Sequence, residues 1–212
     1  MKQILVIDRE FGAGCSRISE KIAARLRWKL FDDELSREIA QLANIPIDVC
    51  RRREERPDSA LQRLVGLIWR GTFDRNLPSP NLAMLDTERL VGLMRLTVER
   101  AAQEGPCVIV GRGAPYFLRD RNETLTVFLY ASRERRFREV LERTGDEQEA
   151  IGLVDSMDDD RRRFVKHYFG YEWPDRDLFH AMLDTGVGED ATVETVLSLL
   201  EVINVNEPRG AA

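Results

Sequence analysis

The feature that most constrains the fold is a short apolar run that leads into a glycine-bearing turn. Residues 2–7, KQILVI, have the length and the branched side chains of a buried strand. The turn at 8–16 contains Gly12 and Gly14, and apolar side chains recur at helical spacing over 16–26. Glycines let successive backbone N–H groups turn inward as an anion-binding nest, and the start of a helix adds its dipole. The chain therefore opens with a strand, a loop suited to phosphate, and a helix.

Two more continuous apolar runs, CVIVG at 107–111 and TLTVFLYA at 124–131, predict buried strands. Two shorter extended segments are predicted at 28–31 and 179–184, and two helices at 147–169 and 193–203. Apolar strands without polar alternation, separated by helical segments, imply a mostly parallel sheet with helices on both faces. We therefore predict a doubly wound α/β fold.

Composition narrows the functional classes. The chain has 212 residues, of which 43% are hydrophobic and 33% charged, so it is long enough to bury one substantial core. A formal charge of −5 argues against a broadly basic nucleic-acid binder. No segment approaches the ~20 apolar residues that cross a bilayer, and the amino terminus has too short an apolar stretch for a signal peptide. We expect a cytoplasmic protein with neither nucleic acid nor membrane as partner; the sequence does not indicate an oligomeric state.

Cysteine and histidine supply little material for a metal centre. The 3 cysteines stand far apart without C-x-x-C spacing, and there are only 2 histidines. This usage predicts neither a disulfide framework nor a zinc site.

The glycine loop matches the phosphate-binding pattern G-x-x-x-x-G-K-[ST] only in part. Gly14 and Ser16 fit the second glycine and the hydroxyl residue, but Arg9 replaces the first glycine and Cys15 replaces the lysine. Taken alone, the loop is also compatible with a glycine turn that merely joins a strand to a helix.

A dinucleotide-binding fingerprint is the rival interpretation of the same loop. Gly12 and Gly14 would begin G-x-G-x-x-G, with Asp32 or Asp33 as the later carboxylate that binds ribose. Arg17 stands where the third glycine would allow close packing of helix on strand, which disfavours a dinucleotide-binding oxidoreductase.

Three stretches together resemble the cytidylate kinase-like family of nucleoside monophosphate kinases: DREFGAGCSRISEKIAARL, FDDEL and CVIVGRGAPYFLRDRNETLTVFLYASRERR. Residues 158–185 are similar to that family's lid and final strand, where an Asp-x-x-Arg element precedes an aromatic stretch. The resemblance implies a P-loop fold like that of adenylate kinase over 1–205, with a helical monophosphate-binding insertion at 34–104, a lid-like segment at 146–178 and a tail at 206–212. It also implies phosphoryl transfer from ATP, with Mg²⁺, to a pyrimidine monophosphate such as CMP.

The same resemblance assigns expected roles to individual residues. Those around the donor phosphates are Gly12, Ala13, Gly14, Cys15, Ser16 and Arg17, and Ser16 is also the expected Mg²⁺ ligand. Those at the acceptor are Arg9, Asp33, Arg112 and Gly113. Those of the catalytic group are Arg136, Asp158, Arg161 and Arg162.

Structural alternatives stay open for several of these residues. Ser16 and Asp33 also suit the cap of a helix. Arg161 and Arg162, which follow three aspartates, also suit a solvated helix face with ion pairs three or four residues apart. The missing lysine leaves a second function open, a nucleotide-binding protein that has lost catalysis.

Overall fold

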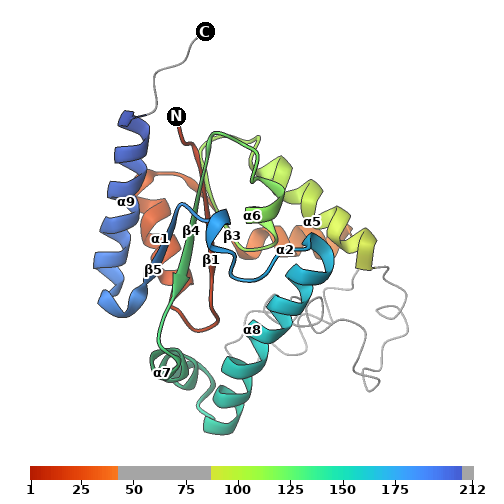
Figure 1. Ribbon diagram of the computed structural model, residues 1–212, viewed down its shortest axis with the longest axis vertical. Coiled ribbons are helices and arrows are strands. Elements are labelled where there is room, and N and C mark those ends of the chain that lie inside the picture. Colours follow the sequence, from red (N-terminus) through yellow and green to blue (C-terminus); the bar gives the residue numbers. More distant parts are fainter. Residues whose placement is uncertain (43–86, 207–212) are drawn as a thin grey trace.

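The structure is a computed structural model that describes residues 1–42 and 87–206 (Figure 1). Its centre is a sheet of five strands in the order β2-β3-β1-β4-β5, in which every neighbouring pair is parallel. The strands are β1 (Ile4–Arg9), β2 (Lys29–Phe31), β3 (Cys107–Val110), β4 (Thr124–Tyr130) and β5 (Ala181–Asp184). The predicted parallel α/β fold is confirmed. Dinucleotide-binding domains have the order 3-2-1-4-5-6, so this sheet is wound differently.

The strands are apolar throughout because both faces of the sheet are covered. In β1, Ile4 and Val6 belong to the hydrophobic core on one face, whereas Leu5 and Ile7 belong to the core on the other. This division follows from the alternation of side chains along a strand. All four side chains are almost fully buried, which accounts for the continuous apolar run in the sequence.

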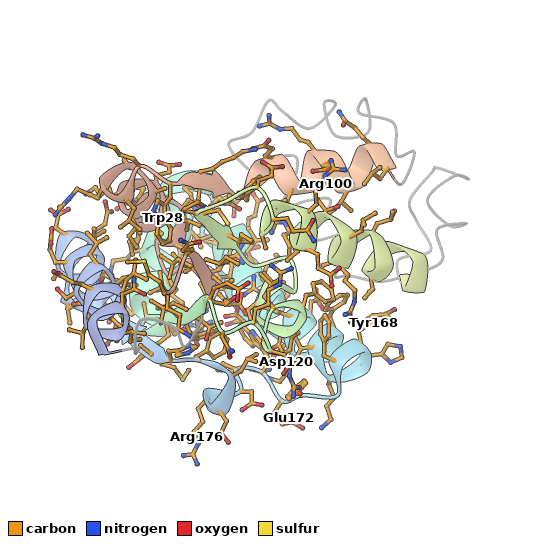
Figure 2. The ribbon with its side chains drawn as sticks, turned by 90° about the horizontal axis from the view of Figure 1, so that it is seen from above. Trp28, Arg100, Asp120, Tyr168, Glu172 and Arg176 are labelled. Carbon is orange, nitrogen blue, oxygen red and sulfur yellow. The ribbon has the colours of Figure 1, made fainter. Side chains whose placement is uncertain are left out.

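Helices form a layer on each face of the sheet (Figure 1). The helices α1 (Cys15–Leu26) and α9 (Glu189–Asn206) pack against Leu5 and Ile7. The opposite core takes side chains from α2 (Asp33–Leu42), α5 (Thr87–Ala101), α6 (Ala114–Phe117) and α8 (Glu147–Phe169). Figure 2 shows Arg100 of α5 beside α2, where it forms an ion pair with Glu38. The sheet is thus the middle of three layers.

A helical hairpin projects from one end of the sheet. It consists of α7 (Arg133–Thr144) and the first turns of α8, which lie near the turn between β1 and α1 in Figure 1. Its own small core contains Phe11 from that turn together with Val140, Val154 and Met157. The hairpin therefore packs directly on the glycine loop.

Much of the predicted helical insertion at 34–104 lies outside the described residues, as do residues 207–212 of the predicted tail at 206–212; Asn206 is the last residue of α9. Only α2 and α5 of that insertion are described, and the division of the chain into core, insertion and lid stays a prediction. Within 1–42 and 87–206, no helix is long and apolar enough to cross a membrane.

Candidate phosphate-binding site

The glycine loop ends in an uncapped helix. Gly14 is the N-cap of α1, with φ of 74°, and no side chain caps the helix there. The first N–H groups of a helix lack acceptors one turn earlier, and together with the dipole they favour an anion. Ser16 lies within the first turn and is exposed, so it is not the N-cap that one interpretation of the sequence allowed.

A pocket of about 120 Å³ opens in front of this helix end. The segment 9–17 supplies most of its lining, and the turn after β3, α7 and α8 supply the rest; the lining residues are Arg9, Glu10, Phe11, Gly12, Ala13, Gly14, Cys15, Ser16, Arg17, Arg112, Glu139, Arg143, Met157 and Arg161. Of the fourteen residues expected at the site, the structure brings nine into this lining. The expected donor residues 12–17 are all among them.

Close packing on α7 fixes the path of the loop. Gly12 has φ of 83°, and a Cβ there would lie 2.8 Å from the backbone oxygen of Arg136 and 3.1 Å from a methyl of Val140. Only glycine fits this approach without displacing the helix. Arg136 also donates from Nη1 to the backbone oxygen of Phe11, at 3.3 Å.

Asp158 joins the loop to the two helices of the hairpin. Its Oδ1 accepts from the backbone N–H of Phe11 at 2.9 Å and from Nη1 of Arg161 at 3.1 Å, and its Oδ2 accepts from Nη1 of Arg136 at 2.7 Å. The carboxylate is buried, with 7% of the residue exposed. Burial raises the pKa of Asp158, and the charge of Arg161 and the bond from Phe11 oppose that shift. Asp158 and Arg136 lie behind the pocket and are not part of its lining.

Arg161 points into the site, and Arg162 does not. The Arg161 side chain is buried, donates from Nη1 to the backbone oxygen of Arg9 at 2.5 Å, and lies 5.1 Å from the centre of the Trp173 ring. Burial and the nearby charge of Arg9 lower the pKa of Arg161. Arg162 has half of its side chain exposed and pairs with Asp159 on the outer face of α8. The solvated-face alternative therefore describes Arg162 and fails for Arg161.

Arg112 enters the pocket from the turn after β3. The residue has φ of 55°, between Gly111 at 63° and Gly113 at 74°, so three successive residues are left-handed. Its side chain is 5% exposed, and Nη2 lies 3.6 Å from Oδ1 of Asp32. Gly113 packs against Phe117, whose ring would lie 2.8 Å from an added Cβ. Asp33 begins α2, but its side chain is outside the described residues.

Cys15 occupies the lysine position as a buried thiol. Burial raises its pKa to about 12, against the opposing charge of Arg9, so the thiol is neutral at physiological pH. Arg17 is on the rim, where its guanidinium donates to Glu139 at 2.6 Å and to Glu189 at 2.8 Å. Neither residue offers an uncommitted charge to a phosphate.

The donor set is compatible with a magnesium nucleotide. Among the described residues, no three acidic, histidine or cysteine side chains gather into a metal site. Mg²⁺ that accompanies a nucleotide takes most of its ligands from phosphate and water, and Ser16, an exposed residue in the first turn of α1, brings a hydroxyl to the pocket lining.

Arg143 is a pocket residue that the sequence argument missed. It lies 5.4 Å from the centre of the Phe11 ring, and its Nε is buried without a hydrogen-bond partner within the described residues. Arg136, Val140 and Arg143 recur at intervals of about one turn, so the position of Arg143 on the inner face of α7 was available from helical spacing.

Comparison with known proteins decides the family. A sequence profile of the cytidylate kinase-like family matches residues 4–187, most of the chain. The protein belongs to the cytidylate kinase-like family. No curated protein sequence matches this chain significantly.

Solved structures show the same fold at low sequence identity. An uncharacterized protein from Eubacterium ventriosum has a TM-score of 0.67 at 19% identity, over 94% of this chain and 99% of that one. A gluconokinase from Sinorhizobium meliloti has a TM-score of 0.59 at 15% identity, over 97% of each chain. A shikimate kinase from Bacteroides thetaiotaomicron has a TM-score of 0.54 at 16% identity, over 93% of this chain and 98% of that one. The cytidylate kinase-like protein therefore has the α/β fold of P-loop kinases.

Proposed function

We propose that the protein transfers the γ-phosphoryl group of ATP to a pyrimidine nucleoside monophosphate of the CMP type. The observation that carries the proposal is the convergence of the uncapped α1 terminus, Arg112 and Arg161 on one pocket. A helix terminus accepts phosphate, and two buried guanidinium groups add positive charge from other elements. Family membership supports a kinase-like activity, and the buried arginines favour an acceptor that is itself phosphorylated.

The chemistry would depend on placement and charge rather than on a protein nucleophile. An acceptor phosphate oxygen attacks the γ-phosphorus, the bond to the β-phosphate oxygen breaks, and ADP leaves. The N–H groups of Gly12, Gly14, Cys15 and Ser16 would bind the donor phosphates, the Ser16 hydroxyl would hold Mg²⁺, and Arg112 would form a fork on the acceptor phosphate. When bound, Mg²⁺ neutralises charge on the donor phosphates.

Arg161 would stabilise charge on the transferring group. Its guanidinium is already held by Asp158 and by the backbone of Arg9, so it needs little reorganisation during the reaction. Asp158 is then a positioning residue, because it contacts the loop and Arg161 and does not line the pocket.

One observation favours a second candidate, a nucleotide-binding protein without catalysis. The neutral Cys15 thiol removes the positive charge that the usual lysine brings to the donor phosphates. A kinase of this type needs that charge from elsewhere, and a binding protein does not.

An assay of ADP formation with Mg²⁺, ATP and a panel of nucleoside monophosphates separates these functions. We expect turnover with CMP, dCMP or UMP above the rate without acceptor. The variant Arg112→Asn tests the acceptor site, because asparagine tolerates the left-handed backbone. Its KM for the monophosphate should rise about ten- to a hundredfold, with the KM for ATP little changed. Binding of ATP without transfer to any monophosphate would favour the second candidate.

A further inference from the structure

The donor loop lacks a cation at the position of the usual lysine, because Cys15 is a buried neutral thiol. Arg17, the next basic residue in the loop, is bound by two carboxylates on the rim. If the site binds a triphosphate, as proposed above, its positive charge comes from outside the start of α1.

Arg9 is placed to supply that charge. It is the last residue of β1, its side chain is 17% exposed, and it lines the same pocket as Gly14 and Cys15. The guanidinium lies against the backbone of Gly111, where an added Cβ would be 2.1 Å from Nη1. Gly111 thus makes room for the Arg9 side chain to cross from β1 toward the end of β3.

Carboxylates hold the Arg9 guanidinium less tightly than they hold that of Arg136. Its Nη1 lies 3.6 Å from Oδ1 of Asp8, which is too long for a hydrogen bond. The other carboxylate oxygen of Asp8 accepts a hydrogen bond from the indole of Trp173 at 3.0 Å. Within the described part of the chain, Arg9 forms no hydrogen bond with a carboxylate. Arg136, by contrast, donates to Asp158 at 2.7 Å.

We propose that Arg9 replaces the P-loop lysine, so that a guanidinium at the end of β1 binds the terminal phosphates of the nucleoside triphosphate. The proposal rests on the function proposed above and changes the expected role of Arg9 from the acceptor to the donor side. The planar guanidinium suits two phosphate oxygens at once, and the fixed strand end and Gly111 restrict its position.

The test measures equilibrium binding of Mg²⁺-ATP and of CMP by titration calorimetry to the full chain and to neutral variants. Arg9→Met keeps most of the aliphatic part of the side chain, and Arg9→Gln keeps a hydrogen-bond donor; both remove the charge. Two variants are used so that the test still works if one of them does not fold. Arg25→Met is the control, since it removes an exposed arginine of α1 that pairs with Glu194. Melting curves confirm that each variant is folded.

Loss of Arg9 should weaken ATP binding about ten- to a hundredfold and leave CMP binding within about threefold of wild type. The double variant Arg9→Met with Cys15→Lys should recover most of the lost ATP affinity, because it moves the charge to the usual position. The control should bind both ligands like wild type.

Three results would overturn the proposal while the proposed function survives: a folded neutral variant that binds ATP like wild type, one that loses CMP rather than ATP, or a double variant without recovery. Wild-type protein that binds no ATP would instead refute the proposed function itself, together with this inference. The two failures are therefore distinguishable.

Discussion

Replacing Arg161 and Arg162 one at a time tests whether only Arg161, which is buried at the pocket, contributes to phosphoryl transfer, while Arg162 is an exposed residue of α8. Arg161→Met removes a buried guanidinium with bonds to Asp158 at 3.1 Å and to the Arg9 backbone at 2.5 Å. Breaking a buried ion pair from one side costs about 3 to 5 kcal/mol, a large part of the ~5 to 15 kcal/mol stability of a domain. Arg162→Met removes an exposed pair with Asp159, which is worth about 0 to 1 kcal/mol.

Turnover should separate the two variants further. An arginine that stabilises the transferring phosphoryl group contributes at least about a hundredfold to kcat, so Arg161→Met should lose that factor and still bind ATP. Arg162→Met should stay within about twofold of wild type. Urea unfolding gives the free energies, and steady-state assays well below the melting temperature give kcat. Equal losses of kcat in both variants, or wild-type kcat in a folded Arg161→Met protein, would refute the assignment.

Three further predictions concern the loop. In the native protein at pH 8, Cys15 should resist alkylation that modifies it readily in urea, because a pKa of about 12 leaves about one thiol in ten thousand ionised; peptide mapping measures the difference. Gly12→Ala should lower the free energy of unfolding by more than about 1 kcal/mol, since the residue has φ of 83° and the new Cβ would meet the Arg136 backbone; urea unfolding checks the value. The bond to Arg17 lowers the pKa of Glu139 from its ordinary 4.5, so the pair should contribute less than about 1 kcal/mol at pH 7, and that contribution should disappear as the pH falls from 4.5 through the lowered pKa. Comparing the unfolding of wild type and Arg17→Met across this range tests the sign.

The strands of the sheet were predictable because their burial shows in the local sequence as continuous apolar runs. Strands covered on both faces are uniformly apolar, and 107–110 and 124–130 therefore stand out without knowledge of their neighbours. The predicted helix at 147–169 agrees with α8 at both ends. Asp146 accepts from the backbone N–H of Glu149 at 2.9 Å, and Gly170 ends the helix with φ of 77°. Caps are local signals of the same kind.

The difference between Arg161 and Arg162 was also present in the sequence but was not used. The buried positions of α8 recur at three or four residues, at Ala150, Val154, Met157, Asp158, Arg161, Phe164 and Val165. Arg161 continues this stripe, whereas Arg162 is turned about 100° away. Helical spacing alone therefore predicts which arginine faces the protein.

Contacts between distant segments could not be predicted from local patterns. Phe11 and Asp158 are separated by 147 residues, and Asp8 and Trp173 by 165. Gly111 looked like a flank of Arg112, and only the folded chain reveals that its missing side chain accommodates Arg9. Such pairings depend on how α8 and β3 are placed against β1, which no short stretch of sequence encodes.

A crystal structure with Mg²⁺, a non-hydrolysable ATP analogue and CMP would locate the donor and acceptor phosphates together. We expect the triphosphate against the N–H groups of Gly14, Cys15 and Ser16 at the start of α1, and the CMP phosphate on Arg112, with Arg161 between the two. Phosphates bound away from this pocket, or a triphosphate lying along Arg112 with no room for a second nucleotide, would contradict this expectation.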